Sequence, residues 1–141
     1  MAIFMNSDSK LAVNDKIIIF DDGLYGFEDV KEYILLQEDD KKTIWSLQAA
    51  HNTLPSLVVI DPFMVYEGYS PVLSGGDLEY LGNPCDDDLC FLAVAALKEK
   101  IEESVINLKS PIVVNVKNRR AKQIILENND YPIRYRLFSK Q

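Results

Sequence analysis

Histidine and cysteine are scarce in this chain of 141 residues, which contains one histidine and two cysteines. Zinc centres and nucleophile–base pairs draw largely on these residue types, and the sequence has no zinc-protease, serine-hydrolase or phosphate-loop motif. His51 stands beside a predicted strand end, where a histidine is more often a surface residue than a catalytic one. The sequence therefore favours a non-enzymatic protein without cofactor or metal, with a small unrecognised enzyme as an alternative.

Long apolar runs are also missing, since the longest, Phe91–Leu97, is far too short to cross a bilayer. The segment Met1–Lys10 lacks the basic stretch followed by an apolar stretch that marks a secretory leader. The two cysteines make no visible disulfide framework. We therefore expect a cytosolic protein.

Positive charge is in deficit, with 15 lysines and arginines against 22 acidic residues and a net charge of −7. Such a surface repels a phosphate backbone and suits a basic protein partner. The only basic cluster contains Lys117, Arg119, Arg120 and Lys122. No aromatic residues are interleaved with these charges as in single-strand binders, so we interpret the cluster as a solvated hairpin tip rather than an RNA contact.

Acidic residues form a triplet, Asp86, Asp87 and Asp88, between Cys85 and Cys90. Three aspartates suggest Mg²⁺ or Ca²⁺, but the glycine and the terminal glutamate of an EF-hand loop are absent. The cysteines are also spaced too widely for a zinc pair. We therefore predict an acidic turn that precedes a strand, with Cys90 buried as a small apolar residue.

The segment 21–28, which reads DDGLYGFE, contains two glycines, Gly23 and Gly26. The third glycine and the helix start of a phosphate-binding loop are missing. We therefore predict a turn in which Leu24 and Phe27 pack into the core.

Short apolar segments alternate with turns at roughly ten-residue spacing, which indicates an all-β protein with little helix. We predict one compact domain over residues 1–141, an antiparallel barrel or sandwich of about nine short strands, with residues 1–14 partly loose. Residues 63–66 fit a helical turn or an edge strand, and residues 77–81 a short helix whose N-cap lies near Gly76 or Asp77. The predicted strands cover residues 16–20, 32–37, 43–49, 57–60, 90–97, 104–108, 111–117, 122–127 and 133–138.

The segment 107–115, NLKSPIVVN, joins a polar bend to a buried strand. Pro111 favours an extended chain before it, and the β-branched residues that follow favour a strand. Asn107 and Asn115 are candidates for partner contact, although we favour a role in bracing the bends through side-chain to backbone hydrogen bonds.

Several motifs, taken in order, resemble those of the FliW family of flagellar assembly factors. The resemblance covers roughly residues 15–138, and it departs from the family pattern at Tyr25, Ala49 and Ser110. The matching stretches are GLYGFE at 23–28, LQ at 47–48, VIDPF at 59–63, Asp88 with the apolar run after it, NLKSPIVVN at 107–115, QIIL at 123–126 and YPIR at 131–134.

The resemblance implies a cytosolic regulator with a compact, β-barrel-like fold and no catalytic activity. It also implies two protein partners. One is CsrA, an RNA-binding repressor of flagellin translation, which the family prevents from acting. The other is flagellin, which competes for the same regulator. A flagellin-binding chaperone without CsrA regulation is the alternative.

Partner binding by such an acidic protein suggests that acidic clusters steer a basic partner toward a small apolar centre. The clusters lie at residues 38–40, at Asp86, Asp87 and Asp88, and at residues 99–103. Leu24, Tyr25 and Phe63 are the loop-borne apolar residues that we select as candidates for the centre.

Overall fold

Short strands make up most of the computed structural model, which describes residues 16–38, 43–127 and 130–137. None of the helices in these ranges is long or apolar enough to span a membrane. The strands are β1 Ile17–Ile19, β2 Glu32–Gln37, β3 Ile44–Ala49, β4 Ser56–Ile60, β5 Leu89–Ala96, β6 Val105–Ile106, β7 Ile112–Asn115, β8 Arg120–Gln123 and β9 Tyr135–Arg136. The helical segments are α2 Pro62–Val65, α3 Gly75–Tyr80 and the 3-10 turns η2 Asp86–Asp88 and η3 Ile101–Glu103. The predicted all-β class with about nine strands is confirmed.

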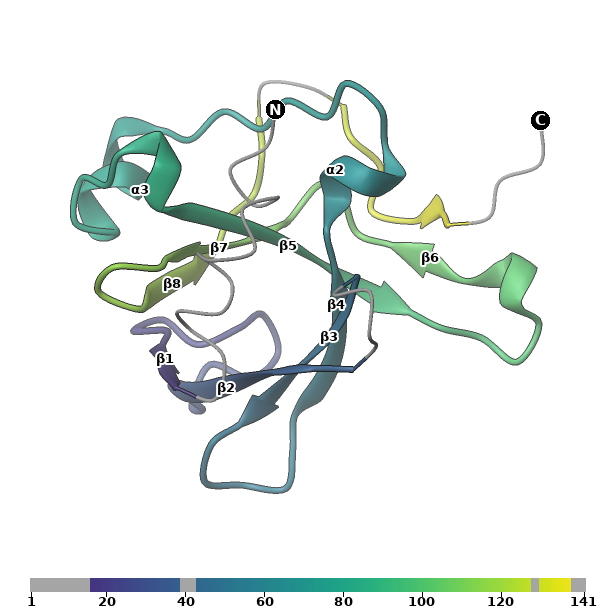
Figure 1. Cartoon of the computed structure of the whole chain (residues 1–141), viewed down its shortest axis with the longest axis horizontal. Coiled ribbons are helices and arrows are strands. Elements are labelled where there is room, and N and C mark those ends of the chain that lie inside the picture. Colours follow the sequence, from purple (N-terminus) through teal and green to yellow (C-terminus); the bar gives the residue numbers. More distant parts are fainter. Residues whose placement is uncertain (1–15, 39–42, 128–129, 138–141) are drawn as a thin grey trace.

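Seven of the strands close into a barrel in the order β4–β3–β2–β1–β8–β7–β5, and β4 pairs with β5 to complete the ring. Strands β6 and β9 extend the sheet from the end of β5 (Figure 1). The described pairings are antiparallel except that of β1 with β8, which is parallel and places Ile19 opposite Arg120. The prediction of a wholly antiparallel sheet is wrong at this seam. Because β1 and β8 are far apart in sequence, no hairpin turn sets their relative direction.

Strand β5 is buried on both faces because it separates two apolar clusters. Cys90 and Leu92 belong to the cluster inside the barrel, whereas Phe91 and Ala93 belong to the cluster outside it. Successive side chains of a strand point to opposite faces, so a strand with two buried faces becomes a continuous apolar run. This is why its sequence lacks the alternation of a strand with one wet face.

We call these clusters the barrel core and the outer core. The barrel core comprises Ile18, Phe20, Leu24, Tyr33, Leu35, Trp45, Leu47, Ala49, Val59, Cys90, Leu92, Ile112, Val114 and Ala121. The outer core lies beneath α2, α3 and the chain after β8, and comprises Ile60, Tyr69, Leu81, Leu89, Phe91, Ala93, Ala95, Ile106, Leu108, Val113, Ile124, Leu126 and Tyr131.

The two ambiguous segments form short helices. Residues 63–66 lie in and after the helical turn α2, where the Asp61 carboxylate accepts the Phe63 N–H at 2.9 Å. Helix α3 begins at Gly75, because the Ser74 hydroxyl caps it by accepting the Asp77 N–H at 3.0 Å. The predicted N-cap near Gly76 or Asp77 is therefore wrong, since the serine hydroxyl satisfies the free amide.

The predicted strands near the C-terminus are longer than the observed ones. Strand β8 ends at Gln123, but the chain beyond it stays beside β7, with hydrogen bonds from Ile124 N–H to the Pro111 carbonyl and from Leu126 N–H to the Lys109 carbonyl. Strand β9 has two residues within the predicted range 133–138. The predictions for residues 1–14 and for the end of that last strand lie outside the described residues.

Candidate functional site

The stretch that begins at Asn107 is a braced bend followed by a buried strand. The side-chain carbonyl of Asn107 accepts the backbone N–H groups of Lys109 and Ser110, at 3.0 and 2.9 Å. Bonds of this kind from an asparagine to the residues after it hold a turn in place. The predicted bracing role of Asn107 is confirmed.

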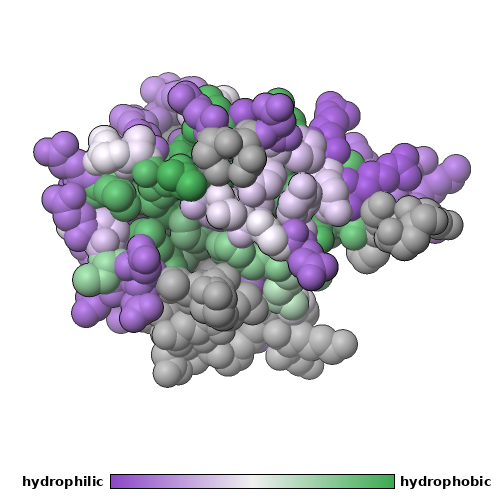
Figure 2. Space-filling model, turned by 90° about the horizontal axis from the view of Figure 1, so that it is seen from above, coloured by the Kyte–Doolittle hydropathy of each residue, from purple (hydrophilic) through white to green (hydrophobic). Residues whose placement is uncertain are grey.

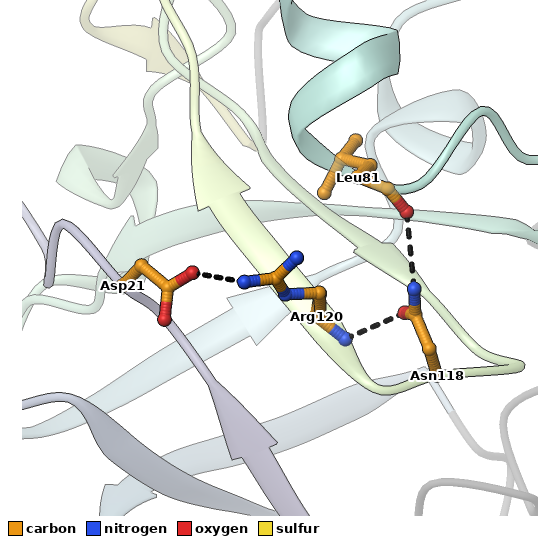
Figure 3. A network of polar contacts seen from close by, with 4 residues as sticks. All are labelled: Asp21, Leu81, Asn118 and Arg120. Carbon is orange, nitrogen blue, oxygen red and sulfur yellow. Dashed lines mark hydrogen bonds and ion pairs between the residues drawn. The ribbon is translucent and has the colours of Figure 1, made fainter.

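Asn115 and Asn118 attach the turn between β7 and β8 to the end of α3. The Asn115 side chain is buried, donates to the Leu81 carbonyl at 2.7 Å and accepts the Lys117 N–H at 3.0 Å. Asn118 donates to the same carbonyl at 3.2 Å and accepts the Arg120 N–H at 2.9 Å (Figure 3). The predicted bracing role of Asn115 is confirmed as well, and its side chain lies inside the protein.

Two of the four basic side chains in the cluster on the β7–β8 hairpin are paired with acids. Arg120 pairs with Asp21 (Figure 3), and Lys122 pairs with Asp77 at 2.8 Å. Burial alone would raise the pKa of the Asp77 carboxyl, but the hydrogen bond from Lys122 lowers it, and the same bond raises the pKa of Lys122. Both cations also lie over the ring of Tyr80. Lys117 and Arg119, the other two cations of the cluster, have no ion pair within the described residues.

The acidic triplet forms the turn η2, just before β5. Asp86 and Asp87 are exposed and have no ion pair within the described ranges, whereas the Asp88 carboxylate accepts the Cys85 N–H at 3.3 Å. Cys90 is fully buried, as predicted, while Cys85 is exposed. Residues 16–38, 43–127 and 130–137 contain no group of three or more His, Cys, Asp or Glu placed to hold a metal ion.

The loop after β1 divides its apolar residues between core and surface. Leu24 lies in the barrel core, as predicted, so its side chain offers no exposed contact. Phe27, also predicted in the core, is 41% exposed, and Tyr25 is 53% exposed. Leu24 and Phe27 are the ends of one tight turn, in which the Phe27 N–H donates to the Leu24 carbonyl at 2.8 Å, and of these two residues only Leu24 is buried. Gly26, the third residue of this turn, permits it with a φ of +90°.

Phe63 lies between the two cores and packs against both. Its ring meets those of Tyr69 and Phe91 edge-to-face, with centroids 5.4 and 5.7 Å apart. The residue that presents apolar surface here is its neighbour Met64, which is 55% exposed.

An apolar groove that we did not predict runs beside α2. It has a volume of about 290 Å³ and is lined by residues of β3, β4, α2 and the loop between β5 and β6. Met64, Leu97 and Ile101 are its exposed apolar residues. Leu97, predicted to be buried, is 46% exposed because β5 leaves the sheet at Ala96, the last residue that pairs with β6.

Three exposed glutamates, Glu99, Glu102 and Glu103, lie on the same loop as the groove residues Leu97 and Ile101. The loop is pinned at its base by the bond from the Lys98 N–H to the buried Ser104 hydroxyl, at 2.9 Å. The groove therefore combines exposed apolar residues with three glutamates, on a loop that a hydrogen bond holds in place. Such an arrangement suits protein binding, because apolar residues beside charged ones are the usual make-up of an interface.

Comparison with known proteins places this chain among flagellar proteins. The sequence profile of the family described as FliW protein matches residues 7–137. The chain is similar to the protein named flagellar assembly factor FliW from Oceanobacillus iheyensis, at 36% identity over 116 residues, 82% of this chain and 79% of that protein. The protein of the same name from Thermotoga neapolitana is 35% identical over 125 residues, which are 88% of this chain and 84% of that one.

A solved structure agrees with these sequence matches. The crystal structure of a flagellar assembly factor FliW superposes with a TM-score of 0.82 at 30% sequence identity. The match covers 89% of this chain and 87% of that chain. The barrel described above is therefore the architecture of that protein too.

Proposed function

The chain belongs to the FliW family of flagellar assembly factors, and from this premise we propose that it binds the RNA-binding repressor CsrA and flagellin as alternative partners. While it holds CsrA, flagellin messenger RNA is free to be translated. Free flagellin then displaces CsrA, and repression resumes. The match of the family profile to residues 7–137 is the observation that carries this proposal.

The acidic surface supports a basic partner. The net charge is −7, and Asp86, Asp87 and the three glutamates of the β5–β6 loop are exposed without ion pairs within the described part of the chain. An RNA-binding protein carries positive charge to meet phosphates, so opposite fields would speed its encounter with this protein.

The groove beside α2 supports an apolar centre for that contact. Affinity in protein interfaces comes mostly from a few well-packed side chains, while charges at the rim act on the association rate. Met64, Leu97 and Ile101 supply exposed apolar area next to Glu99, Glu102 and Glu103. We therefore place the binding surface at this groove rather than at the loop of Leu24 and Tyr25.

Binding kinetics against purified CsrA and purified flagellin test the proposal. We compare two triple variants that remove equal charge: Glu99→Gln, Glu102→Gln and Glu103→Gln near the groove, and Asp86→Asn, Asp87→Asn and Asp88→Asn at the far end of β5. Both should slow association with CsrA, the glutamine variant several-fold and the asparagine variant less. Raising salt until the Debye length is about 8 Å should shrink both effects.

A second comparison separates the apolar centre from its rim. Met64→Ala should speed dissociation, whereas Ile133→Ala, at an exposed apolar residue outside the groove, should not. Failure of the parent protein to bind either partner at micromolar concentration would refute the proposed function. Binding of flagellin without CsrA would replace it with the chaperone role.

A further inference from the structure

Beyond the seam between β1 and β8, the chain that follows β8 presents an open edge outside the closed ring of strands. Strand β1 pairs with β8 only at Ile19, whose N–H donates to the Arg119 carbonyl at 2.9 Å. The Gly23 N–H donates to the Phe20 carbonyl at 2.9 Å, so the chain turns after Phe20 instead of continuing beside β8. The loop of Tyr25 reaches Gln123, whose side-chain oxygen accepts the Tyr25 N–H at 3.1 Å, and residues 124–127 continue along β7 with no strand of the described ranges on their other side.

The backbone of Ile125 faces this open edge. On the inner side, the N–H groups of Ile124 and Leu126 donate to carbonyls of the chain that leads into β7. Because alternate residues of an extended chain direct their N–H and C=O groups to opposite edges, those of Ile125 point away from β7. Neither group has a hydrogen bond in the described ranges, and Ile125 is 51% exposed.

A groove of about 550 Å³ runs along this edge, between the chain after β8 and the segment that leads into α3. Tyr25 and Val72, which line it with Ile125, are 53% and 58% exposed. Figure 2 shows a green apolar area bordered by purple residues on the side of the molecule where Figure 1 places α3 and β8. The edge thus combines unpaired backbone groups with a groove lined in part by exposed apolar side chains.

The charged residues that line the groove indicate the charge expected on a bound segment. Lys122 and Asp77 neutralise each other in their ion pair at 2.8 Å. Glu127 lines the same groove and has no ion pair or hydrogen bond within the described residues. One unpaired negative charge therefore lies beside the open edge.

We propose that this open edge, at Ile125, binds an extended segment of a partner protein, which adds to the barrel as a strand. The segment would exchange backbone hydrogen bonds with Ile125, place alternate apolar side chains against Tyr25 and Val72, and set a lysine or arginine against Glu127. This binding mode does not depend on which proteins are the partners of the α2 groove.

Proline at position 125 tests the backbone contact directly. Ile125→Pro removes the outward N–H and fills the edge, while the inward bonds of Ile124 and Leu126 remain. Ile125→Ala is the matched control, because it removes the same side chain and keeps the N–H. Melting curves establish that both variants fold.

The probe is a displayed library of random peptides of about nine residues, a length suited to one strand. Panning on the parent protein should enrich peptides with alternating apolar residues and a basic residue near one end. Their affinity should fall about tenfold or more for Ile125→Pro and much less for Ile125→Ala. Glu127→Lys should weaken the same peptides, which keeps the test decisive if the proline variant does not fold.

Two results would overturn the proposal. One is the absence of enriched peptides, or enriched peptides that bind the parent protein and Ile125→Pro alike. The other is a parent protein that dimerises in solution and becomes monomeric with Ile125→Pro, which would assign the edge to a second copy of the chain. The library contains neither CsrA nor flagellin, so failure here and failure of the proposed function are distinguishable.

Discussion

The barrel core and the outer core differ in how they are built, although they share β5. The barrel core is enclosed by regular strands and is mainly aliphatic, with Trp45, Tyr33 and Phe20 as its large side chains. The outer core is covered by α2, α3 and irregular chain, and four tyrosines meet there: Tyr66, Tyr69, Tyr131 and Tyr135.

Two tyrosine hydroxyls of the outer core bond to the irregular chain that covers it. The Tyr69 hydroxyl donates to the buried Leu108 carbonyl at 2.7 Å, and the Tyr131 hydroxyl accepts the Ser70 N–H at 2.9 Å. Irregular chain has no ladder of its own, so tyrosines that bring both a ring and a hydroxyl satisfy its backbone groups. In the barrel core, the Tyr33 hydroxyl is buried without a hydrogen bond in the described part of the chain, as is that of Tyr80 at the margin of the outer core.

The difference teaches that stability and binding surface come from different parts of this molecule. The strands close the barrel core completely, whereas both exposed apolar grooves lie where irregular segments meet the sheet. Irregular segments vary in length and sequence at little cost to a fold, which is why binding surfaces are common there.

The largest expected effect is on the barrel core. Trp45→Ala should lower the free energy of unfolding by about 3–5 kcal/mol, because a fully buried indole leaves a cavity that rigid strands cannot fill. Tyr66→Ala, in the half-buried part of the outer core, should cost about 2 kcal/mol, since irregular chain can partly collapse. Urea denaturation measures both, and equal losses would contradict the distinction between the cores.

Alternation and apolar runs were enough to predict the barrel core. Trp45, Leu47 and Ala49 are buried as their spacing predicts, and the run predicted at 90–97 corresponds to β5, which has two buried faces as far as Ala95. The bracing of bends by Asn107 and Asn115 was predictable too, because an asparagine bonds its own neighbours. These features depend on contacts that are local in sequence or periodic along it.

The surfaces could not be predicted in the same way. The groove of Met64, Leu97 and Ile101 exists because β5 leaves the sheet beside α2, and the open edge at Ile125 exists because β1 turns away after Ile19. Both depend on where distant segments end in space. The outward turn of Phe27 likewise depends on the tightness of its loop, which composition does not reveal.

A matched pair of tyrosine variants gives a smaller but sharper test of the two cores. Tyr69→Phe should cost about 1–2 kcal/mol, because it leaves the buried Leu108 carbonyl without its donor. Tyr33→Phe should leave stability unchanged or raise it by up to about 1 kcal/mol, because it removes a buried hydroxyl that has no described partner. Thermal melting of both variants beside the parent gives the two signs, and a loss of stability in both would show that the Tyr33 hydroxyl is satisfied.

The smallest effect concerns alkaline pH. Burial, and then the nearby Tyr131, raise the pKa of Tyr69 above the usual value for tyrosine. The folded protein therefore keeps its Tyr69 proton at a pH where the unfolded chain, with a tyrosine pKa of about 10, has begun to lose it. The stability from this shift is fully present below pH 10 and is lost as the pH rises toward the folded pKa, by about 1 kcal/mol at pH 11.

Tyr69→Phe cannot ionise, so its free energy of unfolding should fall less steeply than that of the parent between pH 9 and pH 11. Burial also raises the pKa of Tyr33, so Tyr33→Phe is the barrel-core counterpart in the same series. Urea denaturation at each pH measures the three slopes. Identical slopes for the parent and Tyr69→Phe would mean that the Tyr69 ring becomes solvated before the barrel opens, and that the outer core unfolds separately from the barrel core.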